Sequence, residues 1–174
     1  MTEIYLEYLR KSRKDAEEEA QGAGETLARH RKILSDLAQA NNYNVVKVFE
    51  EVVSGDSIAD RPEMQKLLKE VETGLYAGVL VVEVERLSRG DGIDQAIVSK
   101  TFQYTNTKII TPTKIYDPNN EMDAEYFEFG LFMSRREYNM IKRRLKRGKE
   151  MAAKEGKWSN GFAPFGYQKV KLQL

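Results

Sequence analysis

Cysteine is absent from the 174 residues, and histidine occurs once, as His30. The absence of cysteine excludes disulfides and thiolate metal sites. The one histidine is expected on the surface of a helix. It is too few for a zinc site of the usual kind, and a surface position argues against a histidine-based catalytic triad. No apolar run approaches the roughly 18–20 residues of a membrane span, and residues 1–3 lack the features of a signal peptide. We therefore expect a cytoplasmic protein without a membrane partner.

Charge is distributed unevenly along the chain. The formal net charge is only +1, with 41% hydrophobic and 32% charged residues, which suits one soluble domain with a real core. Residues 135–149, however, hold eight basic residues and one acid, so this segment carries +7 and the rest carries −6. Such segregation favours a local contact with a polyanion such as nucleic acid. The residues expected to make this contact are Arg135, Arg136, Lys142, Arg143, Lys146, Arg147 and Lys149.

Hydrophobic patterning predicts alternating strands and helices over the first two thirds of the chain. The expected strands are residues 4–9, 44–49, 79–84 and 108–111. The expected helices are residues 26–40, 62–73 (with Asp60 as its N-cap) and 91–104. This alternation predicts an α/β fold, with a mainly parallel sheet of about four or five strands and helices on both faces.

The last third has a different pattern. From Phe127 to Ala152, apolar and small residues recur at intervals of four and three. This spacing predicts one long helix over residues 122–155, about 50 Å in length at 1.5 Å per residue. Its first half should cover the sheet or a partner subunit, and its basic second half should project.

Charged motifs follow the first three predicted strands. Tyr8, Arg10 and Ser12 come at the end of the first strand, residues 54–61 follow the second, and residues 85–89 follow the third. The carboxyl ends of parallel strands share one edge of a sheet, and ligands collect at that edge. We therefore expect the three motifs to lie together, although they are far apart in the sequence.

The residue types at this edge suit attack on a phosphodiester. A serine hydroxyl, here Ser12, becomes a nucleophile when nearby positive charge favours its ionised form. Guanidinium groups also stabilise the charge that develops on phosphate oxygens. The arginines expected there are Arg10, Arg61, Arg86 and Arg89, with Arg144 from the long helix. Metal-dependent nucleases need clustered carboxylates, which occur here only in a loop-like stretch at residues 15–19, so we expect neither a metal nor a cofactor.

Five motifs, taken in order, resemble the serine recombinases. They are Tyr8-x-Arg10-x-Ser12; Ser54-Gly55 with Arg61-Pro62; Glu85-Arg86-Leu87-Ser88-Arg89; a helix with Glu137, Ile141, Arg144 and Gly148; and Gly161-x-x-Pro164-Phe165-Gly166-Tyr167. The last motif is similar to the start of the second domain of the large members of this family, the phage integrases and related transposases.

The resemblance implies a resolvase-like catalytic domain in which Ser12 attacks DNA and forms a 5′-phosphoserine link. The arginines would bind the phosphate, Tyr8 and Ser54 would shape the pocket, and Glu85 would donate a proton or orient an arginine. A dimer on each double-stranded attachment site and a tetramer in synapsis would exchange strands in a bacterial host cell. The implied parts are a catalytic α/β domain (1–121), a long interface and DNA-contacting helix (122–155), and a linker into a DNA-binding domain (156–174).

Some positions depart from the family pattern. Glu85 stands where the family usually has aspartate, and Arg143 stands near a position where many smaller relatives have an acid. Glu51, where relatives often have aspartate, is expected to be a structural partner for an arginine. The residues do not identify a general base for Ser12.

Three other interpretations stay open. The chain could be a transposase of the same family, which the sequence does not separate from an integrase. It could be a non-catalytic, DNA-bound oligomerisation module, although the intact set of arginines disfavours this. It could also be a metal-dependent phosphoesterase, whose activity a chelator would abolish.

Overall fold

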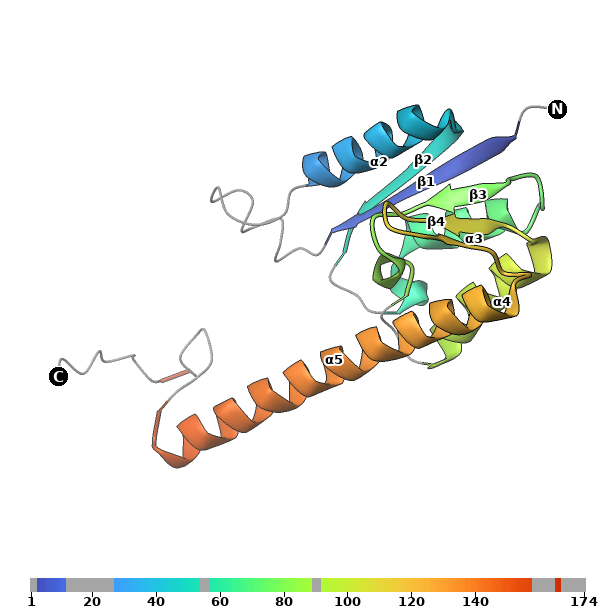
Figure 1. Ribbon diagram of the computed structural model, residues 1–174. Coiled ribbons are helices and arrows are strands. Elements are labelled where there is room, and N and C mark those ends of the chain that lie inside the picture. Colours follow the sequence, from blue (N-terminus) through green and yellow to red (C-terminus); the bar gives the residue numbers. More distant parts are fainter. Residues whose placement is uncertain (1–2, 12–26, 54–56, 89–91, 158–164, 167–174) are drawn as a thin grey trace. The chain divides into compact units, whose positions relative to one another are not determined.

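Two compact units make up the chain, residues 1–135 and residues 136–174. The computed structural model describes residues 3–11, 27–53, 57–88, 92–157 and 165–166 (Figure 1). The first unit contains the sheet, and the second contains the C-terminal part of the last helix.

Five strands form one sheet in the first unit. They are β1 (Ile4–Lys11), β2 (Asn44–Val52), β3 (Gly78–Leu80), β4 (Lys108–Ile110) and β5 (Ile115–Tyr116). Their order is β2-β1-β3-β4-β5; the first four are parallel, and β5 is antiparallel to β4. The predicted α/β fold with a mainly parallel sheet is therefore confirmed.

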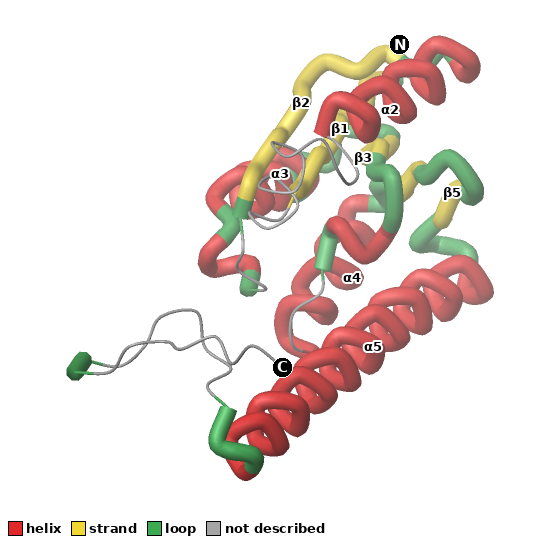
Figure 2. The backbone as a smooth tube through the Cα atoms, turned by 90° about the vertical axis from the view of Figure 1, so that its left-hand side faces the viewer, coloured by secondary structure: helices red, strands yellow, loops and turns green. Residues whose placement is uncertain are grey.

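Helices cover both faces of this sheet (Figures 1 and 2). They are α2 (Leu27–Asn41), α3 (Pro62–Val71), α4 (Gly92–Thr105) and α5 (Glu121–Lys154), with two 3-10 turns, η1 (Ile58–Asp60) and η2 (Val84–Arg86). On one face, α2 packs through Leu34 against Tyr5 and Leu9 of β1. On the other face, α3, α4 and the start of α5 share a larger core with Leu6 and Tyr8. β1 is thus buried on both sides, because successive side chains of a strand point to opposite faces.

The carboxyl ends of β1 and β2 are aligned where the site was predicted. Tyr8 pairs in register with Phe49, and Arg10 pairs with Glu51. Because alternate residues of a strand share a face, these four positions lie on the face of the sheet that α3 covers. Arg10 is therefore placed on the same face as the residues that contact α3.

One prediction about a strand was wrong in detail, and one short strand was not predicted. Residues 79–84 were expected to form one strand, but β3 ends at Leu80 and the chain turns into η2 at Val84. Val81 keeps one sheet-like bond, from its N–H to the carbonyl of Ile110 at 2.9 Å. Strand β5 was not predicted, because two residues are too few to show a period of alternation.

Two predictions about helices were also wrong. Asp60 was expected to cap α3, but it belongs to η1, and Arg61 occupies the N-cap without a side-chain bond to the helix. His30 was expected at the surface, but it is only 2% exposed. Its distance of four residues from the buried Leu34 places both on the inner face of α2.

The predicted long helix is confirmed as α5, which has 34 residues. In the first unit its Phe127 and Leu131 are buried in the larger core, and the Phe127 ring lies 6.0 Å from that of Tyr116 on β5. In the second unit, residues 141–150 are exposed on every side of the helix. Within the described part of the chain, no helix is both long and apolar enough to span a membrane.

Candidate active site

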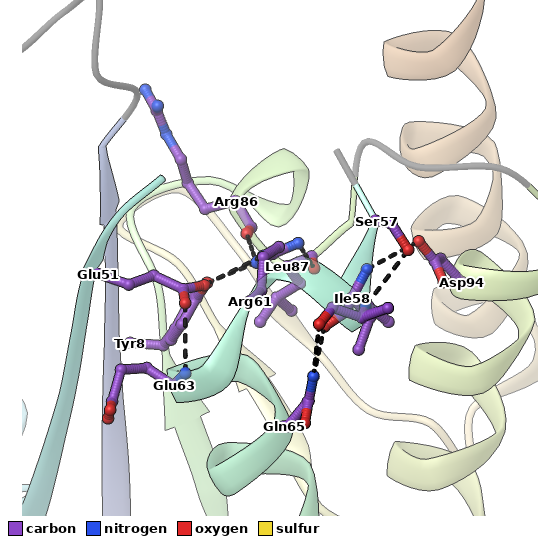
Figure 3. Close-up of polar contacts among 11 residues, drawn as sticks. Tyr8, Glu51, Ser57, Ile58, Arg61, Glu63, Gln65, Arg86, Leu87 and Asp94 are labelled. Carbon is purple, nitrogen blue, oxygen red and sulfur yellow. Dashed lines mark hydrogen bonds and ion pairs between the residues drawn. The ribbon is translucent and has the colours of Figure 1, made fainter. Parts of the chain in front are cut away.

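Arg61 joins the ends of three strands through its guanidinium group (Figure 3). Its Nε donates to Oε1 of Glu51 on β2 at 3.1 Å, and its Nη2 donates to the hydroxyl of Tyr8 on β1. The same group donates to two backbone carbonyls that follow β3, those of Leu87 at 2.8 Å and Arg86 at 2.7 Å. Parts of the three predicted motifs therefore do meet at one edge of the sheet.

Glu51 supports this junction from β2. Its carboxylate accepts hydrogen bonds from the Tyr8 hydroxyl, from Arg61 and, at 3.3 Å, from the backbone N–H of Glu63 at the start of α3. A carboxylate that is only 5% exposed needs such donors and a cationic partner to remain charged. The expectation that Glu51 pairs with an arginine is confirmed.

Tyr8 is held as a protonated hydroxyl. Burial raises the pKa of Tyr8 well above its usual range, and the nearby Glu51 carboxylate adds to this effect while Arg61 opposes it. At neutral pH the hydroxyl therefore donates to Glu51 and accepts from Arg61. Tyr8 fixes the geometry of the junction, and it is not a general base at neutral pH.

Arg86 turns its backbone and its side chain in different directions. Its carbonyl points to Arg61, whereas its side chain extends away from that guanidinium (Figure 3). The side chain is 11% exposed, and its Nη2 lies 3.5 Å from Oε2 of Glu83. Glu85, next to it in η2, is half-buried. The contact with Arg61 thus fixes the main chain of η2, whereas the Arg86 guanidinium lies near Glu83.

Ser88 and Ser57 flank this region. The Ser88 hydroxyl is buried and has no hydrogen-bond partner among the residues that the structure describes. Ser57 caps η1, because its hydroxyl accepts from the N–H of Ala59 at 3.3 Å. Asp94 at the start of α4 fixes the same turn by accepting from the N–H of Ile58 at 3.0 Å.

The other predicted residues are distributed as follows. Arg10 is the last but one residue of β1 and is 4% exposed, on the same face as Tyr8. Ser12, Ser54 and Arg89 lie outside the described residues. Arg144 lies in the second unit and is exposed. The catalytic roles of all these residues remain predictions.

The acidic side chains do not form a metal site in the part of the chain that the structure covers. Among the described residues, no three His, Asp or Glu side chains gather closely enough to hold an ion. The carboxylate at the centre of the junction, Glu51, is instead occupied by Arg61 and Tyr8.

Comparison with known families agrees with this arrangement. The sequence matches the family described as "Resolvase, N terminal domain" over residues 5–158. The chain belongs to the resolvase family of serine recombinases. This resolvase domain is accordingly a recombinase of the kind that acts in site-specific DNA recombination, with DNA as substrate and oligomers as the working form.

Solved structures with the same fold support the assignment. The chain is similar to the C-terminal catalytic domain of ISC1926 TnpA, an IS607-like serine recombinase, with 27% identity and a TM-score of 0.50 over 62% of this chain and 68% of that one. It is also similar in fold to the N-terminal catalytic domain of TP901-1 integrase (21% identity, TM-score 0.55, 82% of this chain and 98% of that one). A resolvase family site-specific recombinase from Streptococcus pneumoniae shares the fold at 19% identity and a TM-score of 0.54, over 88% of this chain and 99% of that one.

Sequence reasoning missed one surface of the resolvase domain. The heptad stripe identified Phe127 and Leu131, which are buried within the unit itself. In the part of α5 that belongs to the first unit, four other apolar side chains are between 42% and 60% exposed: Tyr126, Phe129, Phe132 and Met133. At 100° per residue they lie on the side of the helix opposite Phe127 and Leu131. A helical projection of residues 122–135 would have found this second apolar face.

Proposed function

We propose that the protein catalyses strand exchange by nucleophilic attack of the Ser12 hydroxyl on a DNA phosphodiester. The serine hydroxyl gives up its proton as its oxygen forms a bond to phosphorus, the bond from phosphorus to the 3′ oxygen breaks, and the departing oxygen takes up a proton. The 5′ end is left as a phosphoserine ester. One phosphate ester replaces another, so the reverse reaction reseals the DNA without ATP, metal or cofactor.

The four hydrogen bonds of Arg61 are the observation that best supports this proposal. They connect Tyr8 near the end of β1 with the carbonyls of Arg86 and Leu87 after β3. Ser12 directly follows Lys11, the last residue of β1. A junction that ties these strand ends together is what a serine nucleophile and its arginines require.

The residues would divide the work as follows. Arg10, Arg86 and Arg89 would bind and polarise the phosphate, because planar guanidiniums match its oxygens with paired donors. Arg61, with four bonds to protein acceptors, would act mainly by fixing the main chain that carries Arg86. The supporting set would be Tyr8 and Ser54, which shape the pocket, Glu85, which donates a proton or orients an arginine, and Arg144, which completes the site from α5.

Assembly would use the outer face of α5. The exposed side chains of Tyr126, Phe129, Phe132 and Met133 form the outer apolar face, and a helix that is apolar on two sides is normally covered on both. We propose that a second subunit covers it, with a dimer on each attachment site and a tetramer in synapsis.

The basic part of α5 would contact DNA. Its side chains at residues 141–150 are exposed, and most charges there are positive. Cations that replace the counterions of phosphates supply affinity for any sequence. The proposed set is Arg135, Arg136, Lys142, Arg143, Lys146, Arg147 and Lys149.

Two biological settings are compatible with this chemistry. Integration and excision of phage-type DNA in a bacterial cell is the first, because the motif at residues 161–167 is similar to that of the large integrases. Transposition is the second, and the 27% identity to an IS607-like TnpA favours it. Mapping the ends of the DNA segment that the protein moves would distinguish a single attachment site from many targets.

Trapping the covalent intermediate tests the proposal. A duplex selected from a random-sequence pool by binding to the full-length protein would be incubated with it and denatured, and the peptide that retains the phosphate would be mapped. We expect Ser12→Ala to bind this selected duplex and form no adduct. The matched control Ser35→Ala, at an exposed position of α2, should form the adduct normally. An adduct that persists in Ser12→Ala would remove Ser12 from this role.

A further inference from the structure

Helix α5 lies close to η2 at Gly130. A Cβ atom at this position would lie 3.2 Å from Cγ2 of Val84, the first residue of η2. Carbon atoms in ordinary van der Waals contact are about 3.5–4.0 Å apart. Val84 is buried in the same core as Phe127 and Leu131 of α5. Glycine at 130 is therefore what allows the helix to lie directly against the turn.

Two further contacts join α5 to the first turns of α4. Nε2 of Gln95 donates to the carbonyl of Leu131 at 2.7 Å. Nη1 of Arg135 lies 3.1 Å from the place where a Cβ of Gly92 would stand. Residues 127–135 of α5 thus lie against η2 at Val84 and against the start of α4 at Gly92 and Gln95.

Arg61 provides a second support for the main chain of η2 and Leu87. Its bonds to the carbonyls of Arg86 and Leu87 fix the main chain next to Val84. The position of Arg86 therefore depends on two supports, α5 through Gly130 and the N-terminus of α3 through Arg61. A displacement of α5 by a few tenths of an ångström would be transmitted to η2, because close-packed protein interiors contain few voids that could absorb it.

Gly130 lies between the buried side of α5 and the outer apolar face, because at 100° per residue it is about 60° from Phe127 and about 60° from Met133. Phe129 and Phe132, on either side of Gly130 in the sequence, are 60% and 54% exposed. A subunit that covers this face would therefore press on the same turns of helix that contact η2. The turns of α5 that carry the outer apolar face are thus the turns that lie against η2.

We infer that Gly130 is a positioning residue. Through its close approach to Val84, α5 sets the position of residues 84–88, which include Arg86. A second subunit that covers the outer apolar face would act on Arg86 through the same approach. This inference rests on the proposed function, in which Arg86 binds the phosphate. Gly130 itself does not contact DNA in this role, and a change at Gly130 acts on the rate of phosphoryl transfer.

A steric rescue tests the inference. Gly130→Ala adds a methyl group against Val84, and Val84→Ala removes the atom that this methyl would meet. At saturating selected duplex we expect Gly130→Ala to slow adduct formation by about 10- to 100-fold, the effect of a small misplacement of catalytic groups, with unchanged DNA affinity. The double variant should recover to within about threefold of the rate of Val84→Ala. A double variant as slow as Gly130→Ala would overturn the inference.

Amide hydrogen exchange of the protein without DNA gives a readout that does not depend on cleavage. In Gly130→Ala, exchange at residues 84–88 should change, and in the double variant it should return toward that of Val84→Ala. Gly148→Ala is the matched control for an added helical methyl, because nothing lies within 4 Å of that position, and it should leave residues 84–88 unaffected. No change at these residues in Gly130→Ala would refute the coupling, whereas loss of adducts in every variant would count only against the proposed chemistry.

Discussion

Arg61 and Glu51 form an ion pair that is almost completely removed from solvent, with Nε 3.1 Å from Oε1 and side chains 1% and 3% exposed. Removing one partner leaves the other charge buried without compensation, which typically costs about 3–5 kcal/mol. We therefore expect Arg61→Ala to lower the free energy of unfolding by about this amount in urea denaturation. The carbonyls of Arg86 and Leu87 would also lose their donors.

An exposed pair provides the control for this prediction. Arg31 and Glu50 also form an ion pair, but their side chains are 59% and 34% exposed. Surface pairs contribute about 0–1 kcal/mol, so Arg31→Ala should have little effect. In the double variant Arg61→Ala with Glu51→Ala, the loss should be smaller than the sum of the single losses. Equal effects of Arg61→Ala and Arg31→Ala would contradict the account of the junction.

Glu7 should make stability depend on pH. Its Oε1 is buried without a hydrogen-bond partner among the described residues, and burial raises the pKa of this carboxyl, against an opposing effect of Arg31. Between the ordinary and the raised pKa the folded protein binds more protons than the unfolded chain, so stability falls as pH rises through this window. The cost is complete above the raised pKa and absent below the ordinary one.

Glu7→Gln removes this cost, because the amide is neutral at every pH. We expect the variant to gain about 1 kcal/mol at pH 7.5, or roughly 2–4 °C in Tm, and to match the wild type at pH 4. Glu72→Gln, at an exposed position, is the control and should show no such pH-dependent gain. A Gln variant that is less stable at pH 7.5 would mean that attraction to Arg31 outweighs the cost of burial.

The sequence predicted the parts of the fold that have a strong period and missed those that do not. β1 and β2 are apolar runs bounded by polar segments, and both were predicted, whereas the hydrogen bond from Tyr8 to Glu51 that their alignment allows was not. The two-residue β5 has no detectable pattern. For His30 the pattern was present but was not used. Its spacing of four residues from Leu34 indicates a buried position, whereas the prediction of a surface position followed from the residue type alone.

The candidate site was only partly predictable for a similar reason. Motif spacing indicated that Arg61 belongs to the site, but two of its acceptors are backbone carbonyls, which no side-chain pattern identifies. The close approach of Gly130 to Val84 is also invisible in the sequence, since it depends on how two separate elements pack. Residue types thus predict which groups take part, and packing decides what each one contacts.

Self-association should depend on the outer apolar face. The wild-type protein is expected to form dimers or larger species in sedimentation at high concentration, because Phe129 and Phe132 are large, exposed and adjacent on α5. The variant Phe129→Glu with Phe132→Glu should shift this equilibrium to monomer. Leu75→Glu, which changes an apolar side chain that is 68% exposed elsewhere on the unit, should not. Equal association of all three proteins would exclude this face as the interface.

Adduct formation should not respond to removal of divalent metal. The proposed chemistry uses guanidinium groups where a metal-dependent nuclease uses cations held by carboxylates. The selected duplex would be incubated with the protein with and without EDTA, the EDTA in about 10-fold excess over any divalent ions. The yield of the phosphoserine adduct and its rate of formation should agree within about twofold. A loss that added Mg²⁺ restores would favour the metal-dependent phosphoesterase instead.

The basic part of α5 should govern the salt dependence of DNA binding. Each phosphate contact that releases counterions contributes roughly one unit to the slope of log K against log salt concentration. Lys146→Gln combined with Arg147→Gln should weaken binding to selected and unrelated duplexes alike and reduce the slope by about two units, as measured by fluorescence anisotropy between about 50 and 200 mM salt. Lys66→Gln is the control, because it also removes one exposed positive charge, here from a side chain on α3 that is 64% exposed. It should leave the slope unchanged. Because the contact is with the backbone of DNA, a loss confined to the selected duplex would point to base recognition by this helix and contradict the prediction.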